Sequence, residues 1–141
     1  MAANPNPIFS RVGAVSLGTA ITAVVTDYTG IGANNVVLSY TADGTNGGFV
    51  QRIRFKAAGT NAVSVARIYL NNGSTNATAA NNTFYGEISL PATTASVTAA
   101  TVDVDYAMNF ALPPGYRIVV GISATTTLAS GWVPTVIAGQ Y

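Results

Sequence analysis

A Pro-Pro-Gly break at residues 113–115 separates two segments in which apolar side chains occupy every second position. The apolar positions are Val104, Tyr106, Met108, Phe110 and Leu112 before the break, and Ile118, Val120 and Ile122 after it. A period of two is typical of strands that place one face on a core. Proline fixes φ and removes a backbone donor, and Gly115 can adopt a positive φ, so the chain is expected to turn here. Residues 103–123 are therefore predicted to form a hairpin in an antiparallel β domain.

The rest of the chain contains further short β-prone segments separated by Gly, Asn, Asp and Pro. One or two strands are predicted within residues 11–29, and one strand each within residues 36–40, 49–57, 62–70, 83–90 and 132–137. Residues 92–102 fit a loop or a weak edge strand. No segment shows a helical stripe. This pattern predicts an all-β fold: a single antiparallel β-sandwich, jelly-roll-like, over residues 11–141, with an extended N-terminal arm over residues 1–10.

Strict alternation also predicts which side chains face the core. In residues 49–57 it places Phe49, Ile53 and Phe55 on one face, and Val50 with the basic residues on the other. In residues 83–90 it places Phe84 on the same face as Ile88 and Leu90, and Tyr85 opposite them.

Charge is scarce in this chain. Hydrophobic residues make up 49% of the 141 residues and charged residues only 8%, with a formal net charge of +1. A nucleic-acid-binding protein of the basic type needs a strong excess of Lys and Arg, so no nucleic-acid partner is expected. The chain is either an unusually bland monomer or a subunit whose surface is largely covered by neighbours. We favour the second interpretation, because charged residues are depleted at packed interfaces.

Two residue types with distinctive chemistry are missing. The sequence contains neither cysteine nor histidine, which excludes thiolate chemistry, Cys-based metal sites and the usual general base near neutral pH. A Ser/Lys pair through Lys56 is conceivable but lacks the sequence context of such enzymes. We expect no enzyme activity, no cofactor, no metal and no small-molecule substrate. Residues 12–25 are too short and too interrupted to span a bilayer, so we expect a soluble protein without a cleaved leader or a membrane partner.

Three basic residues share one face of the strand predicted at residues 49–57. They are Arg52, Arg54 and Lys56, and Arg67 would join them if this strand paired with the next one. Like charges at adjacent same-face positions repel, so an offsetting partner is expected. One interpretation is a docking face for an acidic partner surface, since Arg clamps carboxylates in bidentate fashion. The other is a solvated face with local partners such as Glu87 and Asp103.

Asp103 and Asp105 lie two residues apart, hence on one face of their strand and away from the core. Paired carboxylates can ligate calcium or perform acid–base chemistry, but calcium requires six or more oxygens. A glycosidase pair would have to straddle a cleft. We expect instead that these aspartates form structural ion pairs with the basic strand, across a sheet or a subunit boundary.

Other features have ordinary explanations. The Asn-rich loop at residues 71–83 holds three Asn-x-Ser/Thr matches, at Asn72, Asn76 and Asn81, which chance explains in such a composition. Four aromatic residues could make a sugar-stacking platform, although alternation suggests that most of them pack in the core: Tyr69, Tyr85, Tyr116 and Trp132. Within the arm, Pro5 and Pro7 favour an extended chain that ends in Ile8 and Phe9. This segment would either contact a neighbouring subunit or form a frayed terminus.

Several segments in order resemble a known family. They read GFVQRIRFKAAG, VARIYLNNG, GEISLPAT, FALPPGYRIVVGIS and a C-terminal AGQY, between residues 48 and 141. This order resembles the capsid decoration, or cement, proteins of tailed bacteriophages, which have a jelly-roll-like β fold. The resemblance implies a structural virion protein on the outer surface of the capsid. It also implies a homotrimer that bridges subunits of the major capsid protein and whose terminal arm reaches over neighbours. No catalytic motif is carried over.

Two other functions remain open from the sequence. One is a phage tail- or fibre-associated protein that binds the host, and the other is a lectin-like carbohydrate-binding module. Under the cement interpretation, the partner-binding residues are expected to be Arg52, Arg54, Lys56, Arg67, Ile8 and Phe9.

Overall fold

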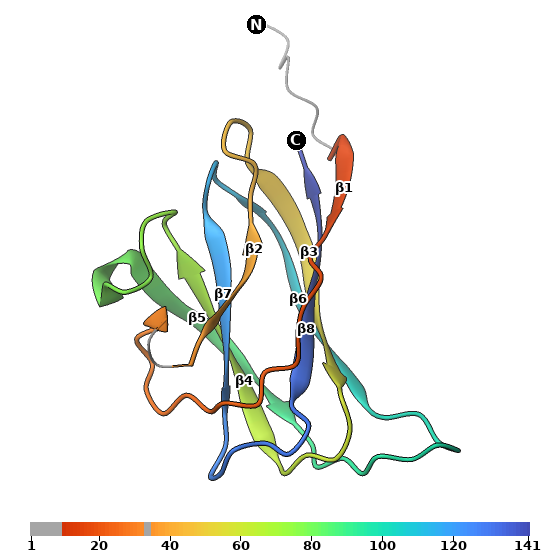
Figure 1. Ribbon diagram of the computed structural model, residues 1–141. Coiled ribbons are helices and arrows are strands. Elements are labelled where there is room, and N and C mark those ends of the chain that lie inside the picture. The colour runs from red at the N-terminus through yellow and green to blue at the C-terminus, as the bar shows by residue number, and fades with distance from the viewer. Residues whose placement is uncertain (1–9, 33–34) are drawn as a thin grey trace, which may run out of the picture.

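The computed structural model describes residues 10–32 and 35–141, and these residues include eight strands and the short 3-10 helix η2 (Figure 1). The strands are β1 (Val12–Val15), β2 (Val37–Thr41), β3 (Gly48–Ala57), β4 (Ser64–Asn71), β5 (Asn82–Leu90), β6 (Asp103–Leu112), β7 (Arg117–Ser123) and β8 (Trp132–Gln140), and the helix η2 spans Ala79–Asn81. The predicted all-β class is confirmed. The predicted arm, including Ile8 and Phe9, lies outside the described residues except for Ser10.

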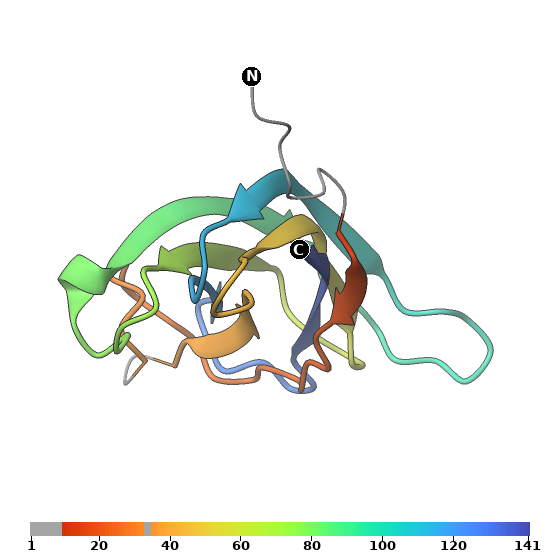
Figure 2. The same cartoon turned by 90° about the horizontal axis from the view of Figure 1, so that it is seen from above.

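The strands form two four-stranded antiparallel sheets that pack face to face (Figures 1 and 2). Sheet I has the order β1-β8-β3-β6 and sheet II has the order β2-β7-β4-β5. The outermost pairings join β1 to β8, β2 to β7, β3 to β6 and β4 to β5, as if one long hairpin had been wrapped around a core. This strand order is that of a jelly roll, so the predicted sandwich is confirmed.

The prediction of a hairpin at residues 103–123 is wrong in one respect. β6 and β7 both alternate as predicted, but β6 belongs to sheet I and β7 to sheet II. The Pro-Pro-Gly turn, with Gly115 at φ 74° and the Tyr116 amide bonded to the Pro113 carbonyl, carries the chain from one sheet to the other. Alternation cannot distinguish these cases, because two strands that face a common core alternate alike whether they pair or lie in opposite layers.

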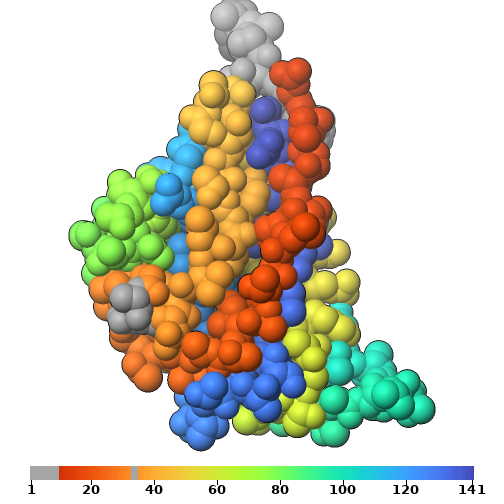
Figure 3. All heavy atoms as spheres, viewed as in Figure 1, coloured from red at the N-terminus to blue at the C-terminus, as the bar shows by residue number. Residues whose placement is uncertain are grey.

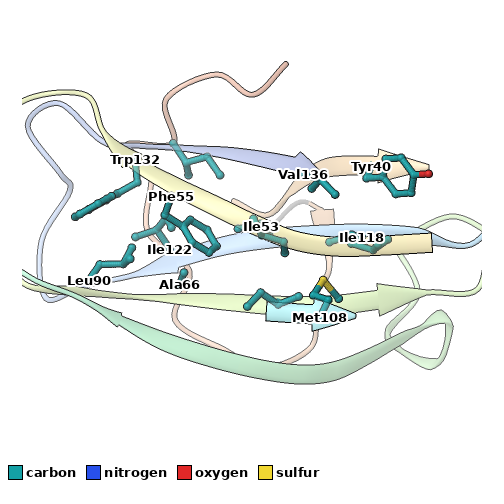
Figure 4. Packing of buried hydrophobic residues seen from close by; sticks show 14 of the residues in the cluster. Tyr40, Ile53, Phe55, Ala66, Leu90, Met108, Ile118, Ile122, Trp132 and Val136 are labelled. Atoms are coloured by element: carbon teal, nitrogen blue, oxygen red, sulfur yellow. The ribbon is translucent and has the colours of Figure 1, made fainter. Parts of the chain in front are cut away.

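The core fills the space between the sheets (Figure 4). Its fully buried side chains include Ile53 and Phe55 from sheet I and Ile118 and Ile122 from sheet II, with Trp132 at one end. Burying an aliphatic or aromatic side chain of this size stabilises a fold by about 1.5–3 kcal/mol. The sandwich therefore rests on apolar burial between two layers.

Two β-bulges overturn the predicted facing of particular residues. The β3 register against β8 shifts between Val50 and Arg52, so that Val50 is buried and Phe49 is only half-buried. The β5 register shifts against β4 beside Tyr85, and Phe84 then contacts Tyr69 on the outer side of sheet II. An extra residue reverses the alternation beyond it, which a strict period of two cannot anticipate.

Within residues 11–29 only β1 is a regular strand. The chain then continues as an irregular segment, residues 16–32, which we call the strap. Its Val25 amide bonds to the Ile122 carbonyl, and Val25 packs with Val36, Tyr69 and Val119 in a second buried cluster. Tyr69 and Val119 lie on the outer side of sheet II, so the strap covers part of that face.

A second irregular segment, residues 91–102, joins β5 to β6 and projects from the body of the sandwich (Figures 1 and 2). We call it the finger. Apart from an isolated bridge between Asn61 and Thr93 it forms no β-structure, which agrees with the loop interpretation of residues 92–102.

Candidate functional site

The basic residues predicted as a docking face lie on the outer side of sheet I. Arg52, Arg54 and Lys56 follow the bulge at Gln51, and their side chains are 40–46% exposed. Their neighbours Ile53, Phe55 and Ala57 point into the core. The three cations therefore share one face, as predicted.

β6 places the two aspartates directly beside these cations. Arg54 lies opposite Asp105 and Lys56 opposite Asp103 in the antiparallel register. The Arg54 guanidinium donates from Nη2 to Asp103 and lies 3.4 Å from Asp105 through Nε. The predicted ion pairing is confirmed, and it occurs between neighbouring strands of one molecule.

Arg52 and Lys56 complete the array, which we call the ionic strip (Arg52, Arg54, Lys56, Asp103 and Asp105). Arg52 Nε lies 3.8 Å from Asp105, and Lys56 Nζ lies 3.8 Å from Asp103. Three cations and two carboxylates leave one positive charge. Exposed pairs of this kind contribute about 0–1 kcal/mol each to stability. The two aspartates therefore mainly offset the repulsion among the three cations.

The ionic strip is tied to the base of the finger. Lys56 Nζ donates a hydrogen bond to the Thr101 carbonyl, and Thr101 Oγ1 donates to the Ala57 carbonyl at 2.9 Å. The Ala57 amide bonds to the Val102 carbonyl at 3.0 Å. The strip and the finger base are thus parts of one continuous surface.

Arg67 does not belong to this surface, because the strand pairing on which its grouping with the other cations depended does not form. β3 and β4 lie in different sheets, so Arg67 lies on the outer side of sheet II. Its guanidinium stacks on the Tyr28 ring at 3.8 Å and donates to the Asp27 carbonyl at 2.9 Å. Glu87 approaches it to 3.7 Å. Arg67 holds the strap against the sheet.

Two of the four aromatic residues predicted as a stacking platform are not at the surface. Trp132 and Tyr69 are fully buried, and they belong to different clusters, one between the sheets and the other beneath the strap. Tyr85 packs edge-on against Tyr106, with ring centroids 6.3 Å apart. Burial raises the pKa of Tyr106 above its usual value, and Tyr85 adds to this rise. Trp132 and Tyr69 are therefore unavailable to a sugar ring, whereas Tyr85 is 40% exposed.

The Asn-rich loop is ordered by its own amides. Asn72 Nδ2 donates to Asn81 Oδ1 at 3.3 Å, and Asn81 Nδ2 donates to the Thr75 carbonyl at 2.8 Å. Asn82 Nδ2 reaches the Thr29 carbonyl of the strap at 3.2 Å. The amide nitrogens of two Asn-x-Ser/Thr matches, Asn72 and Asn81, therefore have structural roles.

Within residues 10–32 and 35–141, no cluster of three or more His, Cys, Asp or Glu side chains could hold a metal ion. In the same described part of the chain, no helix is long and apolar enough to cross a membrane.

The chain was compared with protein-family models, with curated proteins and with solved structures, and nothing in the three comparisons matches it.

Proposed function

We propose that this protein is a capsid decoration, or cement, protein of a tailed bacteriophage. It sits on the outer surface of the head as a homotrimer and bridges subunits of the major capsid protein. It works by contact and not by catalysis. The proposal starts from the sequence resemblance, and the jelly-roll strand order supports it because that architecture recurs in capsid proteins as well as in lectins.

The observation that carries the proposal is the outer face of sheet I. This face bears the ionic strip beside small or uncharged residues such as Ala107, Ala111 and Thr135, and no segment of the described chain packs across it as the strap packs on sheet II. Most of its charge is already balanced internally. A rigid, open and nearly neutral sheet face suits a second protein surface.

The lectin-like alternative loses two of its four proposed stacking residues, because Trp132 and Tyr69 are buried. The tail- or fibre-associated alternative is not favoured by any particular contact. It remains an outcome of the experiment.

The direct test is sedimentation of the purified protein, alone and with heads of the parent phage made without it. We expect about 43 kDa in solution, three times the chain mass of 14.4 kDa, and co-sedimentation with the heads. Binding to host cells but not to heads would favour the tail or fibre function. Binding to neither, with retention on a glycan array, would favour the lectin function.

A variant pair locates the contact. Arg52→Ala together with Arg54→Ala should weaken head binding at least tenfold and leave the fold intact. Arg117→Ala is the matched control, since it removes a guanidinium from sheet II that bonds to the Ser74 carbonyl. Equal head binding by both variants would contradict a role for the ionic strip.

A further inference from the structure

The finger is an ordered apolar protrusion without charge. Thr93 and Asn61 exchange two backbone hydrogen bonds at its base, of 2.9 and 3.0 Å, and the Ala95 amide donates to Thr60 Oγ1 at 2.9 Å. Near its end, Ser96 Oγ accepts hydrogen bonds from the amides of Thr98 and Ala99 at 3.1 Å each. These bonds hold the finger in shape without help from another molecule.

The finger presents an apolar side chain to solvent. Val97 has a relative exposure of 104%, so it makes almost no contact with the rest of the chain. Residues 91–102 contain only Pro, Ala, Thr, Ser and Val. A fixed protrusion with an exposed valine at its end is suited to an apolar contact with a neighbour.

A second surface lies along the side of the sandwich where β1 and β2 end the two sheets (Figures 2 and 3), and neither of these strands contains a charged residue. We call it the aliphatic edge, and its exposed members are Val12, Val15, Leu17, Val37 and Leu38. Leu17 is the most prominent, at 94% exposure. Between Arg11 and Asp27, and again between Asp27 and Asp43, the chain has no charged residue.

The charge distribution indicates which partner would cover this edge. A nucleic acid, a phospholipid headgroup or an acidic protein would find little opposite charge there, because β1, β2 and the strap contain no Lys or Arg, and the cations nearest in sequence or register are Arg11 before β1 and Arg117 opposite Thr41. A matching surface must itself be apolar and uncharged. The finger of a second copy has that chemistry, and it projects from its own sandwich (Figure 1).

We propose that the finger of one copy packs on the aliphatic edge of the next copy, with Val97 set against Leu17. This inference rests on the proposed homotrimer and deepens it. The two surfaces are different parts of the molecule, so the contact is head-to-tail. A head-to-tail contact closes into a ring when its rotation allows, and a ring of three identical contacts is a trimer.

Two substitutions break the contact from opposite sides. Val97→Asp and Leu17→Asp each place a charge on a side chain that is nearly fully exposed, so neither should disturb the fold of a single copy. We expect each variant to sediment at 14.4 kDa instead of about 43 kDa. Ala77→Asp is the matched control, since it adds the same charge to the exposed Asn-rich loop, and it should remain trimeric.

Cysteine cross-linking tests the direction of the contact. The chain has no cysteine, so Val97→Cys and Leu17→Cys introduce unique thiols. With a short bis-maleimide, a mixture of the two single variants should give covalent dimers that neither variant gives alone. A chain carrying both substitutions should give covalent trimers. Dimers from either single variant alone would indicate a two-fold contact and would overturn the inference.

The outcomes separate this inference from the proposed function. A wild-type trimer whose mass is unchanged by both Asp substitutions would overturn the finger contact and leave the homotrimer standing. A wild-type monomer would overturn the homotrimer and the contact together. Binding of the wild-type protein to phage heads is measured separately, and it tests the cement function whatever the variants do.

Discussion

Each outer face of the sandwich carries an arginine, but one arginine is covered and the other is exposed to solvent. On sheet II, Arg67 lies beneath the strap with only 10% of its side chain exposed, stacked on Tyr28 and bonded to a backbone carbonyl. On sheet I, Arg54 is 46% exposed and pairs with two aspartates in solvent. One guanidinium joins two parts of the fold, while the other is available to a partner.

This difference shows that the role of an arginine on a strand depends on whether its side chain is covered or exposed. A buried guanidinium with hydrogen bonds and a stacked ring stabilises its fold, and its removal leaves polar partners without water. An exposed ion pair contributes little to stability because water and salt screen it. We therefore expect the covered face to determine stability and the open face to determine binding.

Among the substitutions that test this difference between the two faces, Tyr69→Ala should have the largest effect on the free energy of unfolding. Tyr69 is fully buried beneath the strap with Val25, Val36 and Val119, and its hydroxyl donates to the Asp27 carbonyl. Removing a buried aromatic ring costs about 3–5 kcal/mol, so urea unfolding should show a loss of this size. Tyr69→Phe is the control and should lose only about 0.5–1.5 kcal/mol, the contribution of one hydrogen bond. Equal losses in the two variants would contradict the packing role of the ring.

Arg67→Ala should have the next largest effect. It removes the hydrogen bond to Asp27, the stacking on Tyr28 and the ion pair with Glu87, and we expect a loss of about 2–3 kcal/mol in the free energy of unfolding. Hydrogen exchange should also accelerate at the Val25 amide, which bonds to Ile122. Arg67→Lys should recover only part of the loss, because an ammonium cannot stack and fork as a guanidinium does. Full recovery would show that charge alone matters there.

Alkaline pH should loosen the covered face to a smaller extent. Burial raises the pKa of Tyr69 above its ordinary value of 10.0, against an opposing effect of Arg67. A raised pKa in the folded state means that stability is fully present below pH 10 and falls as pH rises through the folded-state pKa. Unfolding free energies measured from pH 8 upward should therefore stay level to about pH 10 and then decline, less steeply in Tyr69→Phe. Tyr40 and Tyr106, whose pKa values burial also raises, account for the remaining slope.

The smallest change in stability is expected on the open face. Arg54→Ala removes exposed pairs with Asp103 and Asp105 and should cost about 0–1 kcal/mol. A double-mutant cycle with Asp103→Asn should give a coupling energy that shrinks further in 1 M salt. A loss as large as that of Arg67→Ala would remove the distinction between the two faces.

Patterns along one strand predicted much of this molecule. Alternation in β6 and β7 placed Met108 and Ile118 in the core, and like charges on β3 pointed to Asp103 and Asp105 as their partners. Both inferences concern neighbours that share a face, and strand geometry constrains such neighbours directly. The partner-binding role proposed for Arg52, Arg54 and Lys56 stays a prediction.

The sequence did not reveal which strands share a sheet or in what register they pair. Nothing in the composition of residues 62–70 reveals that β4 lies in the sheet opposite β3, so Arg67 was grouped with the wrong surface. The bulges beside Gln51 and Tyr85 reversed the facing of Phe49 and Phe84, because each depends on the register of a neighbouring strand. The sequence also did not reveal that the strap packs closely on Gly121. A Cβ atom at this position would lie only 2.8 Å from a methyl carbon of Val25.

The sequence by itself determined that this chain is an all-β sandwich around an apolar core, since alternation and turn residues act locally. Tertiary structure alone decided which strands share a sheet, which outer face the strap covers and where the finger projects. Those choices depend on contacts between residues far apart in the chain, such as Val25 with Ile122 and Thr93 with Asn61. Local patterns do not encode such contacts, because their free energy exists only once both segments are in place.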